Sequence, residues 1–150
     1  MKKILIIGLG SVLREDDAAG IRVIEELEKE KLPANVTLKT GDISGLDILK
    51  YFPSYDKILI VDAAEMNEEP GTIKIFDFRD IKHSGFRDIF STHGMTLLET
   101  LTLGEKAGIN PDEITIIGIQ PLRARYGFEL SGLIKAKIPA VVEIIKKKMI

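Results

Sequence analysis

The stretch KILIIGLGSVLREDDAAG, residues 3–20, joins a short apolar run to a glycine-rich turn and three consecutive acids. Its apolar part is rich in isoleucine, which is typical of a strand that is buried on both faces. After the acids, the apolar residues Ile21, Ile24 and Leu27 recur at helical spacing with charged residues between them. The stretch therefore predicts a strand, a tight turn and a helix that runs from Ala18 to about Lys31.

Strands and helices alternate along the rest of the chain. Pro70 and Gly71 form a turn just before the fourth expected strand. The connection to this strand is too short for a crossover, so we expect the strand to be antiparallel. The last helix should break or restart at Pro139. The pattern predicts an α/β fold: a single three-layer domain over residues 1–150, with a doubly wound, mostly parallel five-stranded sheet and one antiparallel strand. The expected strands are 3–10, 35–41, 56–64, 72–76 and 112–121, and the further helices are 45–52, 93–108 and residues from 131 onward.

The composition excludes several classes of protein. Of 150 residues, 45% are hydrophobic and 29% are charged, and the net charge is −2. This balance is typical of a soluble globular protein and gives no electrostatic basis for binding nucleic acid or an anionic membrane. The absence of cysteine excludes disulfides, thiolate metal sites and a cysteine nucleophile. The N-terminal apolar run is too short to span a membrane and lacks a cleavage signal, so we expect a cytoplasmic protein without membrane insertion.

The glycine turn raises nucleotide binding as one alternative. The dinucleotide fingerprint needs a third glycine after Gly8 and Gly10, and this chain has Leu13 at that position. The three acids that follow would also repel a phosphate group. A Rossmann-like nucleotide-binding enzyme is therefore the less favoured alternative. We expect Glu15 and Asp16 to set the local charge and cap the helix.

Three potential metal ligands converge on one edge of the predicted sheet. Asp17 follows the first strand, Asp62 ends the third, and His93 precedes a later helix. In an open α/β sheet, ligands bind outside the carboxyl ends of the strands. Two carboxylates and one imidazole suit a borderline divalent metal such as nickel or zinc. Each residue also has a structural alternative: Asp17 could stabilise a helix N-terminus, Asp62 could accept bonds from loop amides, and His93 could cap a helix.

Four separated motifs resemble those of the nickel–iron hydrogenase maturation endopeptidases. They are GLGSVLREDDAAG, then IVDAAEM with PGTIKIF, then STHGM, and finally IGIQP. The resemblance extends over nearly the whole chain. It implies an endopeptidase that removes a C-terminal extension from the hydrogenase large-subunit precursor once nickel has been inserted. It also implies that Asp17, Asp62 and His93 contact nickel that the precursor carries, so that the metal belongs to the substrate and is no permanent cofactor.

Two positions depart from the family pattern. The family usually has asparagine where this chain has Ser11, and Asp-Gly-Gly where this chain has Thr40, Gly41 and Asp42. Asp42 is therefore only a doubtful candidate for the site.

The chemistry of cleavage stays open at the level of the sequence. The substrate's nickel could polarise a water or the scissile carbonyl, or Asp17 and Asp62 could share a proton as in aspartic proteases. A serine triad of Ser11 or Ser91 with His93 and Asp62 has the residue types but no supporting spacing. A nickel-handling chaperone with the same three ligands and no catalysis is the alternative function.

Overall fold

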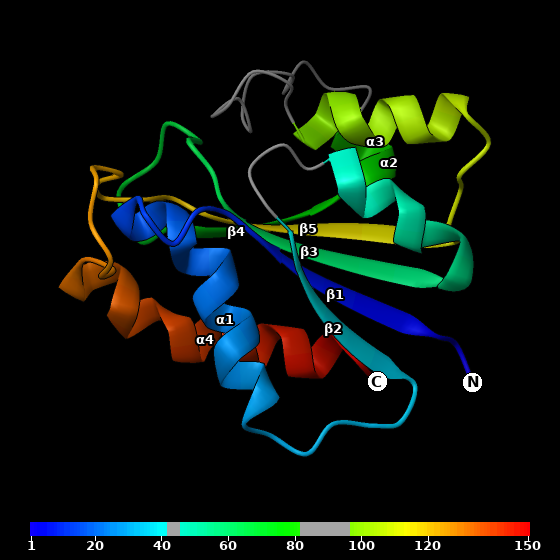
Figure 1. Cartoon of the computed structure of the whole chain (residues 1–150), viewed down its shortest axis with the longest axis horizontal. Helices are drawn as coiled ribbons and strands as arrows, with labels where there is room; N and C mark the ends of the chain where they lie inside the picture. The colour runs from blue at the N-terminus through cyan, green and yellow to red at the C-terminus, as the bar shows by residue number, and fades with distance from the viewer. Residues whose placement is uncertain (42–45, 82–96) are drawn as a thin grey trace.

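The computed structural model describes residues 1–41, 46–81 and 97–150, and its centre is a five-stranded sheet with the strand order β2-β1-β3-β5-β4 (Figure 1). Strand β4 pairs antiparallel with β5, and every other pair of neighbours is parallel. The predicted fold class and the antiparallel strand are thus confirmed. The strands are β1 (Ile4–Leu9), β2 (Val36–Gly41), β3 (Lys57–Ala63), β4 (Ile73–Asp77) and β5 (Glu113–Ile119).

Helices cover both faces of the sheet (Figure 1). Alternate residues of β1 enter two cores: Ile4 and Ile6 pack on the side of α1 and α4, whereas Leu5 and Ile7 pack on the side of η2, α2 and α3. None of the described helices is long and apolar enough to cross a membrane. The helices are η1 (Glu15–Ala18), α1 (Ala19–Glu28), η2 (Leu46–Ser54), α2 (Phe78–Ile81), α3 (Leu97–Lys106) and α4 (Gly132–Lys148).

The expected break at Pro139 is wrong, because α4 runs through this residue without interruption. Proline lacks the N–H that would bond to the carbonyl one turn earlier, a loss that commonly costs about 3 kcal/mol in a helix. The neighbouring residues Ile138 and Val142 are buried in the core that α4 shares with α1. This packing offsets the missing hydrogen bond and keeps the helix continuous.

The glycines of residues 8–20 serve close backbone packing. A Cβ atom on Gly8 would lie 2.2 Å from the carbonyl oxygen of Gly20, and one on Gly20 would lie 2.3 Å from that of Val61. Gly10 has a φ of 141°, and a Cβ atom at this position would lie 1.9 Å from the carbonyl oxygen of Asp17. The first turn of α1 is therefore pressed directly onto β1 and β3, which brings the acids to the carboxyl edge of the sheet.

Candidate functional site

The carboxyl ends of β1, β3 and β5 lie at one edge of the sheet, because these strands are parallel neighbours. Asp17 lies in η1, just after β1, and Asp62 is the penultimate residue of β3. The two carboxylates lie close enough for the negative charge of Asp17 to raise the pKa of Asp62. The structure thus brings these two predicted site residues together.

Asp17 is held in place by its own loop. Its side chain is almost fully buried, and its Oδ2 accepts a hydrogen bond of 3.1 Å from the backbone N–H of Ser11. The Ser11 hydroxyl in turn accepts a bond of 3.3 Å from the N–H of Leu13. Ser11 therefore shapes the turn that carries Asp17, through its backbone and its side chain alike.

Asp62 has a pKa well above its ordinary value. Burial is the main cause, because it removes water from the carboxylate, and the charge of Asp17 adds to it. A hydrogen bond from the backbone N–H of Ala63 acts in the opposite direction and lowers the pKa. Such a carboxyl group either keeps its proton or is stabilised in its ionised form by a nearby cation. Carboxyl groups with shifted pKa values are common at functional sites.

Asp16 does not cap the helix, so that expectation is wrong. Its buried carboxylate instead accepts four hydrogen bonds from residues more than 100 positions along the chain. The backbone N–H groups of Leu122 and Arg123 both donate to Oδ2 at 3.0 Å. Ser131 donates from its backbone N–H to Oδ1 at 2.7 Å and from its hydroxyl to Oδ2 at 2.8 Å. Asp16 therefore ties the acidic loop to both ends of the β5–α4 loop.

Further contacts join the same two loops along their length (Figure 1). Gly127 donates to the Leu13 carbonyl at 2.9 Å and accepts from the Glu15 N–H at 3.1 Å. The Arg14 guanidinium donates to the Ala124 carbonyl at 3.2 and 3.3 Å, and the Glu15 carboxylate pairs with Arg123. Glu15 thus forms an ion pair and caps no helix. These contacts could not be predicted from the sequence, because they join segments that are far apart in the chain.

Gln120, in the GIQP motif, orders the other side of the edge. Its side-chain oxygen accepts a 2.7 Å bond from the N–H of Met66 and a 3.4 Å bond from the N–H of Glu68. Its side-chain nitrogen donates to Glu65 at 2.9 Å. This buried amide fixes the loop that follows β3, just beyond Asp62 and Ala63 at the end of the strand.

Three predicted or doubtful site residues lie outside the described residues: His93, Asp42 and Ser91. The geometry of the predicted trio can therefore be followed for Asp17 and Asp62 alone. Within the described ranges, no group of three or more histidine, cysteine, aspartate or glutamate side chains could hold a metal ion. The two carboxylates form an incomplete ligand set on their own.

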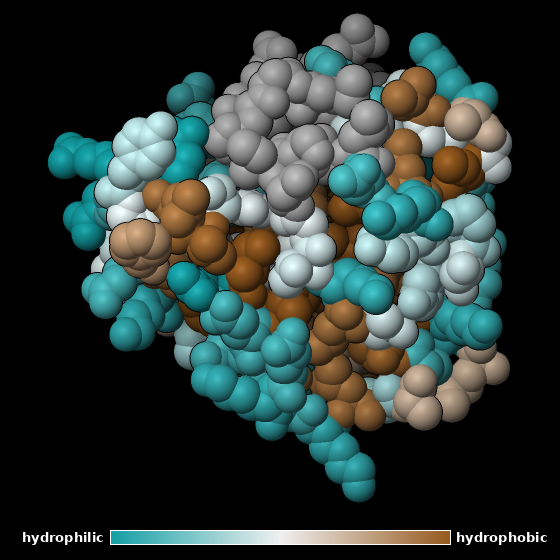
Figure 2. Space-filling view, in the orientation of Figure 1, coloured by the Kyte–Doolittle hydropathy of each residue, from teal (hydrophilic) through white to brown (hydrophobic). Residues whose placement is uncertain are grey.

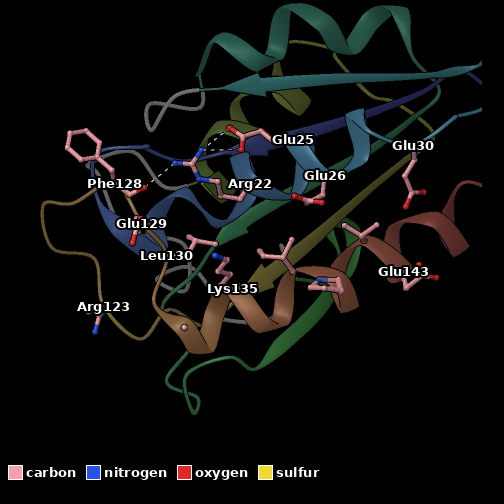
Figure 3. Close-up of a pocket in the computed structure, with 14 residues that line it drawn as sticks. Arg22, Glu25, Glu26, Glu30, Arg123, Phe128, Glu129, Leu130, Lys135 and Glu143 are labelled. Atoms are coloured by element: carbon pink, nitrogen blue, oxygen red, sulfur yellow. Dashed lines mark hydrogen bonds and ion pairs between the residues drawn. The ribbon is translucent and has the colours of Figure 1, made fainter.

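A groove of about 940 Å³ lies away from these acids, between α1 and α4 (Figure 3). Ile138, Pro139 and Val142 give it an apolar floor, and neither Asp17 nor Asp62 lines it. Its border is mostly acidic, with Arg22 already paired to Glu25 at 2.8 Å. The groove therefore has none of the chemistry that the sequence predicts for the site. The acidic border is formed by Glu25, Glu26, Glu30, Glu129 and Glu143.

Comparison with known proteins places this architecture in a family. Residues 21–148 match the family model described as hydrogenase maturation protease. The hydrogenase expression/formation protein HupD of Rhizobium leguminosarum bv. viciae is 31% identical over 94% of this chain and 71% of its own length. The hydrogenase 2 maturation protease of Escherichia coli is 28% identical over 95% of this chain and 88% of its own.

Solved structures of such proteins share the fold. The hydrogenase maturating endopeptidase HybD from E. coli superimposes with a TM-score of 0.80 and 26% identity, over 95% of this chain and 89% of that one. The hydrogenase maturation protease HycI from Thermococcus kodakarensis KOD1 gives a TM-score of 0.75 and 28% identity, over 97% and 91% of the two chains. The likeness therefore extends over nearly the full length of both partners in each comparison.

Proposed function

The chain belongs to the hydrogenase maturation protease family and is a peptidase, and on this premise we propose that it removes the C-terminal extension of a nickel–iron hydrogenase large-subunit precursor after nickel insertion. The observation that carries the proposal is the pairing of Asp17 with Asp62 at the carboxyl edge of the sheet. Their mutual repulsion, which contributes to the raised pKa of Asp62, is relieved by a cation placed between them.

We propose that this cation is the nickel that the precursor carries. Asp17 and Asp62 supply two oxygen ligands, and His93 supplies the imidazole that makes the set suitable for nickel. The metal enters with the substrate, so it reports that the precursor has been loaded. Nickel recognition then restricts cleavage to precursors whose metal centre is complete.

The two acids also suit a water-activating pair. The raised pKa of Asp62 favours its protonated form, so this carboxyl can donate a proton to the scissile carbonyl oxygen. Asp17 is then the partner that takes a proton from the attacking water. In the other chemistry, both acids stay ionised and bind nickel, which polarises the water or the carbonyl. The two chemistries differ in whether cleavage requires the metal.

Mass spectrometry of a purified precursor, with and without nickel, tests the proposal. We expect loss of a C-terminal peptide from the nickel-loaded precursor and none from the apo form. Equal cleavage of both forms would remove nickel from the recognition step and favour the water-activating pair. Binding without any shortening of the precursor would contradict the proteolytic function and favour a nickel-handling chaperone.

Three variants assign the residues. Asp17→Asn, Asp62→Asn and His93→Ala should each lower the cleavage rate by about 100-fold or more, the range typical for a lost acid, base or metal ligand. The matched control is Asp112→Asn, which changes an exposed acid at the opposite edge, just before β5. It should cleave at the rate of the unchanged protein. A fully active Asp17→Asn or Asp62→Asn protein would remove that residue from the site.

A further inference from the structure

Large apolar side chains are exposed beside the acidic edge. Tyr126 is 91% exposed and Phe128 is 73% exposed, and both lie on the β5–α4 loop. Leu122 on the same loop and Leu13 on the acidic loop are about half exposed, at 48% and 52%. Figure 2 shows hydrophobic residues at this end of the molecule, where Figure 1 places the two loops side by side. We call Leu13, Leu122, Tyr126 and Phe128 the aromatic rim.

The loops that carry the aromatic rim are held firmly in place. Asp16 bonds to both ends of the β5–α4 loop, and Gly127, between the two aromatic residues, bonds to the acidic loop twice. The Arg14 guanidinium lies 6.0 Å from the centre of the Tyr126 ring, and Arg22 donates to the Phe128 carbonyl at 3.2 Å. In Figure 3 the Phe128 ring points away from the body of the protein. The rim is thus exposed on a pre-ordered backbone, which lowers the entropy cost of binding a partner.

Two of the three exposed charged residues on the β5–α4 loop are positive, and the third, Glu129, is negative. Arg123 and Arg125 alternate with the apolar residues and are both exposed. The acids on the adjoining loop are turned inward: Asp16 is fully buried, and Glu15 is mostly buried and paired with Arg123. Tyrosine, phenylalanine and arginine together are enriched at the energetic centres of protein interfaces. The α1–α4 groove adjoins this surface, because Arg123 and Phe128 also line the groove.

We propose that the aromatic rim, with Arg123 and Arg125, is the docking surface for the hydrogenase large-subunit precursor, and that it binds an apolar surface of the precursor bordered by acidic side chains. This inference rests on the proposed function for the identity of the partner. The acidic loop connects the rim to the candidate site, because Asp16, which anchors the rim loop, directly precedes Asp17. Docking on the rim therefore places the bound protein against the carboxyl edge of the sheet.

The test measures the dissociation constant of the full-length protein for the nickel-loaded precursor, alongside the kinetics of cleavage. The double variant Tyr126→Ala/Phe128→Ala should raise the Kd and the KM by about tenfold or more, as is typical when interface anchors are truncated. Its kcat should change little, because the acids of the site are untouched. Leu103→Ala on α3, which truncates a 47% exposed leucine elsewhere, is the matched control and should leave both constants unchanged.

A charge reversal tests the chemistry of the partner. Arg125→Glu should raise the Kd, and salt should weaken binding of the unchanged protein more than binding of this variant. An unchanged Kd in the double variant would overturn the docking surface, whatever the cleavage assay shows. Binding that depends on the rim without any cleavage would keep the docking surface and contradict the proposed function. A Kd that falls on Arg125→Glu would exclude an acidic partner surface.

Discussion

Asp16 and Asp62 are both acids at the carboxyl edge of the sheet, yet their surroundings are opposite. The carboxylate of Asp16 accepts four hydrogen bonds of 2.7 to 3.0 Å. Asp62 receives a backbone N–H bond from Ala63 and faces the negative charge of Asp17, and its pKa is raised. The protein's own donors satisfy the hydrogen-bonding capacity of Asp16, whereas Asp62 is stabilised by binding a proton or a metal ion. The number of donors around a carboxylate, more than its place in the sequence, separates a structural acid from a candidate functional one.

The largest expected effect comes from removing the satisfied acid. Asp16→Ala leaves three backbone N–H groups and a hydroxyl without their acceptor, and each buried orphan costs about 1–3 kcal/mol. We expect the free energy of unfolding to fall by about 3 kcal/mol or more. In a protein of this length, about 1 kcal/mol corresponds to a Tm change of about 2–4 °C. Thermal unfolding followed by circular dichroism measures the change.

Asp16→Asn separates hydrogen bonding from simple loss of the side chain. The amide keeps one carbonyl acceptor and places an NH₂ group against donors, so this variant should be destabilised less than Asp16→Ala. Asp112→Asn, at the opposite edge, should unfold like the unchanged protein. An Asp16→Ala protein with an unchanged Tm would contradict the structural role of this carboxylate.

The sheet could be predicted from the sequence, but the hydrogen bonds that join the acidic loop to the β5–α4 loop could not. Buried strands have a local signature, and the turn at Pro70 and Gly71 correctly predicted that β4 is antiparallel. The acids at residues 15–17 look alike in the sequence, and only the fold shows that Asp16 binds residues beyond position 120. Pro139 was misjudged for the same reason, because local propensity does not include the tertiary packing that keeps α4 continuous.

In the candidate site, too, the positions of residues along strands could be predicted from the sequence, whereas properties that depend on tertiary contacts could not. Strand ends are readable, so Asp17 and Asp62 could be assigned to one edge from the strand order alone. The raised pKa of Asp62 could not be read from the sequence, because it depends on burial and on the distance to Asp17. The aromatic rim could not be predicted from the sequence either, because the sequence does not indicate whether a tyrosine or phenylalanine in a loop is buried or exposed.

A smaller effect is expected from Ser131, which serves two elements at once. Its hydroxyl donates to Asp16 at 2.8 Å and accepts a 3.4 Å bond from the N–H of Ile134 as the N-cap of α4. Ser131→Ala removes both bonds and should lower the free energy of unfolding by about 1–2 kcal/mol. Ser131→Thr keeps the hydroxyl and should recover most of the loss. If Ser131→Ala and Ser131→Thr are equally stable, the hydroxyl contributes nothing to the tie.

The smallest effect, and the one with opposite sign, is expected from Asp62. Because the folded protein raises the pKa of this carboxyl, the folded state binds its proton more tightly than the unfolded state does. The protonated form therefore contributes stability below the unfolded pKa, about 4, and this contribution is lost as the pH rises through the folded pKa. Asp62→Asn has no such proton, so it should be more stable than the unchanged protein near neutral pH, and this advantage should shrink as the pH falls.

Thermal unfolding of both proteins between about pH 4 and pH 8 measures this difference, with a chelator present because a bound cation would also relieve the repulsion from Asp17. The gain should be modest, because the hydrogen bond from the Ala63 N–H favours the ionised carboxylate and partly offsets the effect of burial. Two results would contradict this contrast between Asp16 and Asp62. One is an Asp62→Asn protein that unfolds at a lower temperature than the unchanged protein at neutral pH. The other is a stability advantage of Asp62→Asn that grows as the pH falls. A gain in stability combined with lost cleavage would mean that Asp62 is kept for chemistry at the expense of the fold.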